Sequence, residues 1–255
     1  MKPLLTLLLA LCLAHTARAA PDAQAILAAS DAVRNPGFAF SLSNTLTEYR
    51  KGKQSDSSTL VVYSRASASD GQFRSLVRYQ APARDVGKLI LYNGRDLWFY
   101  DPASKASVRL SPQQRLLGQA SNGDVVTTNF ARDYRATQAL AEDTLDGDRQ
   151  PRASYKLLLE ASGDGANYPR IEMWVSQDGA RPIKARFYAD SGKLLKTAYY
   201  RRYQRWLGVE RPTETVIIDG LEPDWITVMR YSDWVKREVP EAWLQRDYLP
   251  RFLPE

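Results

Sequence analysis

Apolar and polar residues alternate with a period of two along most of this chain, a pattern typical of strands that bury one face. In the first clear case Phe38, Phe40, Leu42 and Leu46 fall on one face, with serines and threonines on the other. Further strands are expected at 60–65, 72–80, 88–92, 97–100, 155–161, 170–176, 182–189, 193–206, 211–218 and 225–231. Most are separated by short turns rich in Gly, Asp and Ser, so the pattern predicts a large antiparallel meander.

Three segments depart from this period. Residues 22–33 predict a short helix that Asn35-Pro36-Gly37 ends. Between 111 and 133 the alternation stops, and a stretch this long in a compact domain is usually functional or carries short helices. The tail from Pro240 is rich in aromatic residues and leucine, which predicts a short amphipathic helix packed on the sheet. The expected fold class is therefore mainly β with few helices, with the helix and long loop as a candidate lid.

The segment 88–100 is apolar on both of its faces. Asn93-Gly94 is a favoured hairpin turn between two strands. One face carries Leu89, Leu91, Trp98 and Tyr100, and the other carries Ile90, Tyr92, Leu97 and Phe99. We therefore expect this hairpin to be covered on both sides, by a core and by a second element.

The first 19 residues have the order of a cleavable signal peptide. Lys2 is followed by a leucine-rich stretch and by the small-x-small motif Ala17-Arg18-Ala19. The apolar stretch is shorter than the roughly 20 residues that span a bilayer. We expect residues 1–19 to be a signal peptide and residues 20–255 to form one domain located in the periplasm.

Export would change the chemistry that is available. The only cysteine, Cys12, and the only histidine, His15, lie in the predicted signal peptide. The mature chain would then hold no disulfide, no cysteine nucleophile, no histidine base and no Cys/His zinc site. The formal charge falls from +6 to +4 when Lys2 and Arg18 leave, which is only mildly basic. No cofactor and no catalytic residue are predicted.

Two charged stretches suggest other chemistry but favour ordinary structure. Residues 199–206 interleave aromatics with arginines, which in an exported protein indicates a solvated strand or a phosphate-contacting face, not nucleic-acid binding. Asp143, Asp146 and Asp148 do not have the spacing of an EF-hand loop, and a tight turn at Asp146-Gly147-Asp148 explains them. We predict no metal site.

Three stretches carry a resemblance to a known family. They are Gly87–Pro102, then Glu172–Val175 with Pro182–Ala185 and Gly192–Thr197, and finally Met229–Tyr231 onward to Tyr248–Arg251. Together they resemble the LolA-like outer-membrane lipoprotein-sorting family, in particular its larger periplasmic members. The resemblance implies an unclosed antiparallel β-barrel, or half-barrel, wrapped around a helix, with an apolar cavity for acyl chains. These motifs are architectural, so the resemblance transfers no catalytic residue.

The candidate lipid-binding surface is the apolar face of the curved sheet. Its expected cavity residues are Phe40, Leu42, Leu46, Val77, Leu91, Trp98, Tyr100, Met173, Phe187, Val216 and Met229. An acyl chain gains about 0.8 kcal/mol for each methylene that it buries, so an apolar groove alone can bind one.

The function expected from this surface is non-catalytic transport. A monomeric periplasmic carrier would receive a lipid or a lipoprotein acyl chain, from an inner-membrane transporter for example, and deliver it for sorting to the outer membrane. It would contact membranes only peripherally. Two alternatives stay open: a lipid-sensing adaptor or regulator of an envelope protein, and a metal-dependent lipid hydrolase, against which the missing histidine counts.

Overall fold

The computed structural model describes residues 21–94, 96–163 and 166–253, so the predicted signal peptide lies outside the described residues. Thirteen strands form one large sheet. They are β1 (Phe40–Arg50), β2 (Lys53–Ala66), β3 (Phe73–Ala81), β4 (Leu89–Tyr92), β5 (Leu97–Asp101), β6 (Ala106–Leu110), β9 (Tyr134–Ala141), β12 (Ser154–Ala161), β13 (Arg170–Ser176), β14 (Pro182–Tyr188), β15 (Leu194–Trp206), β16 (Val209–Asp219) and β17 (Trp225–Lys236).

The shorter elements lie around this sheet. They are α1 (Ala23–Arg34), η1 (Ala83–Asp85), β7 (Arg115–Leu117), β8 (Ala120–Ser121), α2 (Asn122–Val125), α3 (Phe130–Asp133), β10 (Thr144–Leu145), β11 (Pro151–Arg152), η2 (Glu241–Leu244) and η3 (Arg246–Arg251). Among the described residues, none of the helices has the length and the apolar composition that a membrane span requires.

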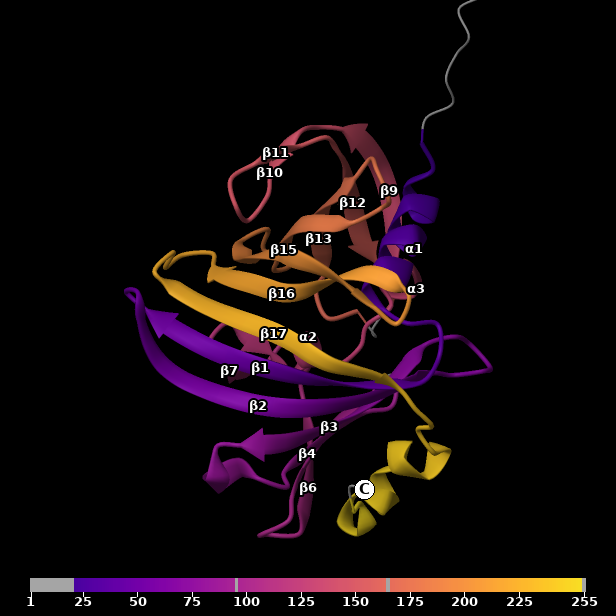
Figure 1. Cartoon of the computed structure of the whole chain (residues 1–255), viewed down its shortest axis with the longest axis vertical. Coiled ribbons are helices and arrows are strands. Elements are labelled where there is room, and N and C mark those ends of the chain that lie inside the picture. Colours follow the sequence, from indigo (N-terminus) through magenta and orange to yellow (C-terminus); the bar gives the residue numbers. More distant parts are fainter. Residues whose placement is uncertain (1–20, 95, 164–165, 254–255) are drawn as a thin grey trace, which may run out of the picture.

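The sheet is antiparallel throughout and does not close into a barrel. Its order is β6-β5-β4-β3-β2-β1-β17-β16-β15-β14-β13-β12-β9, so two meanders meet where β1 pairs with β17. The sheet curves around α1, α3 and the segment that carries β7 and α2 (Figure 1). The predicted mainly β, half-barrel fold is confirmed, and each strand predicted from the alternation is present.

Helix α1 forms where the sequence predicts it and is fixed to the sheet at its β9 edge. Asp22 caps it by accepting hydrogen bonds from the backbone N–H groups of Gln24 and Ala25 (2.9 and 3.1 Å). The Gln24 side chain donates to the carbonyl of Ala131 (2.7 Å) and accepts from the N–H of Ala136 (2.8 Å). These contacts tie the helix to α3 and β9, and Leu27, on the helix itself, is fully buried.

The segment from 111 to 133 contains short elements, as predicted, and it packs on the concave face of the sheet. Gly118 has a φ of +55°, and a Cβ at this position would come within 2.3 Å of the Thr227 hydroxyl oxygen. The next residue, Gln119, donates its backbone N–H to that same hydroxyl (2.8 Å). Glycine therefore allows the chain to approach β17 closely enough to form this bond.

The β4–β5 hairpin is covered on both faces, as its sequence predicts. Ile90, Tyr92 and Leu97 belong to the large core on the concave side, which we call the inner core. Leu89, Leu91, Trp98 and Tyr100 pack on the other side against the C-terminal tail. This second group, the outer cluster, consists of Tyr63, Leu76, Leu89, Leu91, Tyr100, Val239, Trp243, Leu244, Leu249 and Phe252, with Ala39, Val61, Trp98 and Tyr248 at its margin.

The tail that completes the outer cluster differs in detail from the expected helix. It forms two short 3₁₀ helices, η2 and η3, preceded by Pro240 and with Pro250 inside the second. Proline removes an amide donor and clashes with a preceding carbonyl, so a longer α-helix is disfavoured here. Trp243 and Phe252 bury their rings edge-to-face, 5.0 Å apart, against the sheet.

Candidate functional site

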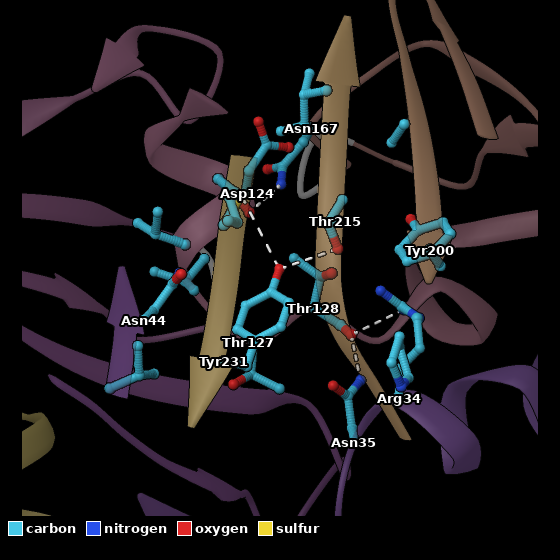
Figure 2. A pocket seen from close by; sticks show the side chains of 18 of the residues that line it. Arg34, Asn35, Asn44, Asp124, Thr127, Thr128, Asn167, Tyr200, Thr215 and Tyr231 are labelled. Carbon is cyan, nitrogen blue, oxygen red and sulfur yellow. Dashed lines mark hydrogen bonds between the residues drawn. The ribbon is translucent and has the colours of Figure 1, made fainter. Parts of the chain in front are cut away.

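A cavity of about 120 Å³ lies between the concave face of the sheet and the segment that covers it. Figure 2 shows Thr215 and Tyr231 on the strands facing Asp124, Thr127 and Thr128 of the covering segment. The strand side of the cavity is largely apolar. Its apolar residues are Phe40, Leu42, Val62, Phe187, Ala198, Pro212, Ile217, Met229 and Trp234.

The covering segment, residues 122–130, is held down by hydrogen bonds at several points. Asn35 at the end of α1 donates its side-chain amide to the carbonyl of Thr128 (2.8 Å). The backbone N–H of Thr127 donates to the Ser75 hydroxyl of β3 (3.2 Å). Asn167 donates to the carbonyl of Gly123 (3.3 Å). Both ends of the segment are therefore anchored across the concave face.

A buried ion pair joins the covering segment to the sheet. Lys196 of β15 lines the cavity and donates to the carboxylate of Asp124, which also accepts from the Ser121 N–H (2.8 Å) and hydroxyl (2.9 Å). Burial alone would lower the pKa of Lys196, but the Asp124 carboxylate and Tyr168 outweigh it, and the net pKa is raised. Lys196 therefore stays charged and tied to Asp124 at neutral pH.

A second ion pair stands at the other end of the cavity. Arg34, in the last turn of α1, lines the cavity and donates to Asp31, one turn earlier. Asp31 also accepts from the N–H of Ala131 (2.7 Å). The Asp31 carboxylate holds the pKa of Arg34 above its usual value despite burial, and burial raises the pKa of Asp31 itself. Each cation that lines the cavity therefore has its own carboxylate.

Three polar atoms on cavity-lining side chains have no hydrogen-bond partner in the described part of the chain. They are Oδ1 of Asn44, Nε1 of Trp234 and Nε of Arg34. Asn44 is 1% exposed and Trp234 is 8% exposed. A buried polar atom without a partner loses its hydration and gains nothing in return, so such atoms are rare in proteins.

The eleven predicted cavity residues fall into four groups. Phe40, Leu42, Phe187 and Met229 line the cavity. Leu46, Val77 and Met173 are buried in the inner core but do not line it. Leu91, Trp98 and Tyr100 belong to the outer cluster beneath the tail. Val216 is half-buried on the opposite face of β16 from its cavity-lining neighbours Thr215 and Ile217. Contact of any of these with a lipid stays a prediction.

The polar residues on the strand side of the cavity were not predicted from the sequence. Asn44 lies two residues after Leu42 and two before Leu46, so it occupies an inward position on β1. Thr215 and Lys196 likewise alternate with outward residues on their strands and are buried. A polar residue at an inward position of an otherwise apolar strand face is the signal that could have identified Asn44.

The acidic cluster forms the tight turn that its sequence predicts. Asp146 accepts from the backbone N–H groups of Asp148 (2.8 Å) and Gln150 (2.9 Å) and from Arg152. Asp148 forms an ion pair with Arg201. Arg201 also forms an ion pair with Glu214 on the adjacent strand. Within the described ranges no group of three or more acidic, His or Cys residues could hold a metal ion.

Comparison with known proteins gives the following similarities. A family model whose description reads "-like: Uncharacterized protein" matches residues 71–251. A LolA superfamily protein from Nitrosomonas europaea has 34% sequence identity and a TM-score of 0.78, over 90% of this chain and 100% of that chain. No match is found among curated protein sequences.

Two further solved structures share the fold at lower identity. A DUF1329 family protein from Desulfovibrio piger has 20% identity and a TM-score of 0.73, over 89% of this chain and 97% of that chain. A Vibrio parahaemolyticus domain described as an outer membrane lipoprotein-sorting protein has 18% identity and a TM-score of 0.75, over 90% and 98% of the two chains.

Proposed function

The chain belongs to the LolA superfamily, and from this premise we propose that it is a non-catalytic carrier whose cavity takes the acyl chain of a lipid or lipoprotein. The observation that carries the proposal is the cavity itself, with an apolar sheet wall on one side and a pinned covering segment on the other. The proposed carrier acts in the periplasm, contacts membranes peripherally and exchanges its cargo with a membrane partner such as an inner-membrane transporter.

The size of the cavity sets a condition on how an acyl chain would enter. An apolar cavity of roughly 150 Å³ accommodates a molecule the size of benzene. The cavity of about 120 Å³ therefore fits only the end of an acyl chain while the covering segment is in place. Deeper insertion requires residues 122–128 to move away from the sheet, which breaks the Lys196–Asp124 pair and the Asn35–Thr128 hydrogen bond.

Native mass spectrometry of the protein purified from the periplasm of an expression host tests the proposal. The expected result is a co-purified lipid, together with uptake of a fluorescent acyl probe. Ala198→Phe fills the cavity wall on β15 and should abolish both, at a stability cost of about 1–3 kcal/mol for overpacking. Val216→Phe, on the opposite face of the neighbouring strand, is the matched control and should leave binding intact.

Other outcomes would favour other functions. A lipid-free spectrum with no probe uptake by the unmodified protein would contradict the carrier proposal. Bound lipid that never moves between donor and acceptor vesicles, with a crosslinked protein partner, would favour the sensing adaptor. Release of fatty acid that EDTA abolishes would favour the hydrolase.

A further inference from the structure

A single buried carboxylate on the outer face of the sheet gathers three arginines. The side chain of Glu214, on β16, is only 4% exposed. The Nε atoms of Arg201 and Arg202 on β15 lie 3.0 and 3.1 Å from its Oε1. The Nε atom of Arg230 on β17 lies 3.0 Å from its Oε2. A buried carboxylate needs one such partner for its charge, so two of the three guanidinium groups are in excess.

The backbone of Arg202 is strained where this residue joins the cluster. Arg201 and Arg202 are consecutive in β15, and consecutive strand residues normally point to opposite faces of a sheet. Arg202 instead has a φ of +55°, which is uncommon for a residue with a Cβ, and its side chain reaches the same Glu214 oxygen as Arg201 does. Strained backbone of this kind is concentrated at ligand sites.

Two of the three arginines keep accessible donors for a ligand. Arg201 has a further partner in the carboxylate of Asp148. Arg202 and Arg230 bind the carboxylate through Nε alone, so their Nη groups have no partner within the described part of the chain. Their side chains are 61% and 52% exposed. Three guanidinium groups face two carboxylates in this network, and the unmatched positive charge with its free Nη donors suits the oxygens of a phosphate group.

The arginine cluster lies where two strands of the cavity wall separate. Glu214 and Arg230 form the last pair at one end of the β16–β17 ladder; beyond them β16 is paired with β15, and β17 with β1. Figure 1 shows the two strands running apart toward the end of β17 that leads to the tail. Past this separation, Pro212 on β16 and Tyr231 and Trp234 on β17 line the cavity. A phosphate at the cluster would therefore be next to the cavity, which favours a lipid headgroup over a free anion.

We propose that Arg202 and Arg230 bind the phosphate of a lipid headgroup on the outer face of the sheet, while the acyl chain passes between β16 and β17 into the cavity. This inference rests on the proposed carrier function and narrows its cargo to a lipid that carries a phosphate. The charge of the headgroup stays in contact with water, so its burial costs nothing. Glu214 is a positioning residue that holds the two guanidinium groups side by side.

Probes with and without a phosphate test the assignment. Decyl phosphate and 1-decanol share a ten-carbon chain, and each competes with a fluorescent acyl probe at pH 7.5, below its solubility or micelle limit. Decyl phosphate should bind about tenfold more tightly, since one charge-assisted hydrogen bond has about that effect. The preference should shrink in about 0.5 M NaCl, because salt screens exposed charges. Inorganic phosphate, which lacks the chain, should bind with a Kd above roughly 1 mM by calorimetry.

A double variant assigns the preference to the two arginines. Arg202→Gln combined with Arg230→Gln should remove it and leave 1-decanol binding within twofold, while Arg201 still neutralises Glu214. Lys193→Gln combined with Arg205→Gln removes the same charge from two exposed residues near the ends of β15 and should keep the preference. Far-UV circular dichroism and thermal unfolding check that both double variants are folded.

The possible failures are distinguishable. If neither ten-carbon probe binds, the carrier proposal fails and this inference fails with it. If decyl phosphate and 1-decanol bind equally, the carrier stands and the headgroup assignment is wrong. Equal losses of the preference in the two double variants would show a general effect of charge and would likewise overturn the assignment. Tight binding of inorganic phosphate that the arginine variant abolishes would assign the cluster to a free anion instead of a lipid.

Discussion

The inner core and the outer cluster share strands β2 to β5 but have different interiors. In the outer cluster, Trp243, Phe252 and Tyr63 fill the space with ring contacts, and none of its residues has a buried polar side-chain atom without a partner in the described part of the chain. The inner side holds a cavity, two ion pairs and partnerless atoms on Asn44 and Trp234. The outer cluster is closely filled, whereas the inner side leaves a cavity and buried polar atoms without partners, both of which cost stability.

The largest expected effect is on the outer cluster. Trp243→Ala removes a buried ring from the tail and should lower the free energy of unfolding by about 3–5 kcal/mol, as measured by denaturant titration. Trypsin should cleave faster at the exposed Arg246 as the tail detaches. Affinity for an acyl probe should stay within twofold. Gln245→Ala, at an exposed position of the same tail, is the control, and a loss of probe binding in Trp243→Ala would break the distinction between the two regions.

On the inner side, Asp124→Asn should destabilise the protein by about 3 kcal/mol because it leaves the buried ammonium of Lys196 without its carboxylate. The association rate of an acyl probe should rise, since the same pair holds the covering segment down. Stopped-flow fluorescence measures the rate and denaturant titration measures the stability. Asp148→Asn, which loses an exposed pair with Arg201, should cost less than about 1 kcal/mol and leave the rate unchanged.

The inner side also holds a carboxyl group whose ionisation opposes folding. Burial raises the pKa of Asp133 to about 6 from 3.8, partly offset by the hydrogen bond from Gln72 (2.5 Å). The native state therefore binds the proton more tightly than the unfolded state, so ionisation destabilises the fold increasingly above about pH 4, with the full effect above about pH 6.

Asp133→Asn should accordingly be more stable than the unmodified protein at pH 7.5, by up to about 3 kcal/mol for a shift of this size. The difference should shrink as the pH falls through 6 and disappear below about 4. Thermal unfolding across this pH range measures it, with the exposed Asp143→Asn as control. A difference that does not vary with pH would contradict the assignment.

The smallest effect concerns the cavity wall. Asn44→Leu should stabilise the ligand-free protein by about 1 kcal/mol, because it removes a buried amide whose oxygen has no partner in the described residues. Asn35→Leu should destabilise it by a similar amount, since it breaks the hydrogen bond to Thr128. In denaturant titration, a higher unfolding free energy for Asn44→Leu and a lower one for Asn35→Leu would sharpen the contrast between the two regions. Equal losses of unfolding free energy would show that the Asn44 oxygen has a hydrogen-bond partner.

The alternation of the sequence predicted the interior strands because each buries one apolar face. It missed β6 and β9, which are the two edges of the sheet. Edge strands carry polar and charged residues that discourage pairing with other chains, such as Arg109 on β6 and Arg135 on β9, so their apolar period is weak. Phe38 was assigned to the first strand, but β1 begins at Phe40 and Phe38 is 36% exposed.

The cavity was less predictable than the sheet. Strand alternation shows which residues share a face, and Phe40, Leu42 and Leu46 do. It does not show which apolar face of the sheet will be covered by the tail and which will border a cavity. Leu91 lies beneath the tail, whereas Met229 lines the cavity. That outcome depends on contacts between segments far apart in the chain, such as Trp243 with Tyr63.

The pairing of β1 with β17 also constrains how the chain reaches its native state. Phe40 lies opposite Lys236, so the centre of the sheet joins residues almost 200 positions apart in sequence. Strands with such distant partners form late, because closing the intervening loop costs entropy before the contacts form. Until β17 arrives, the first meander has an open edge at β1, where strands of other chains can pair. Folding of the newly made chain is therefore expected to be slow and sensitive to protein concentration.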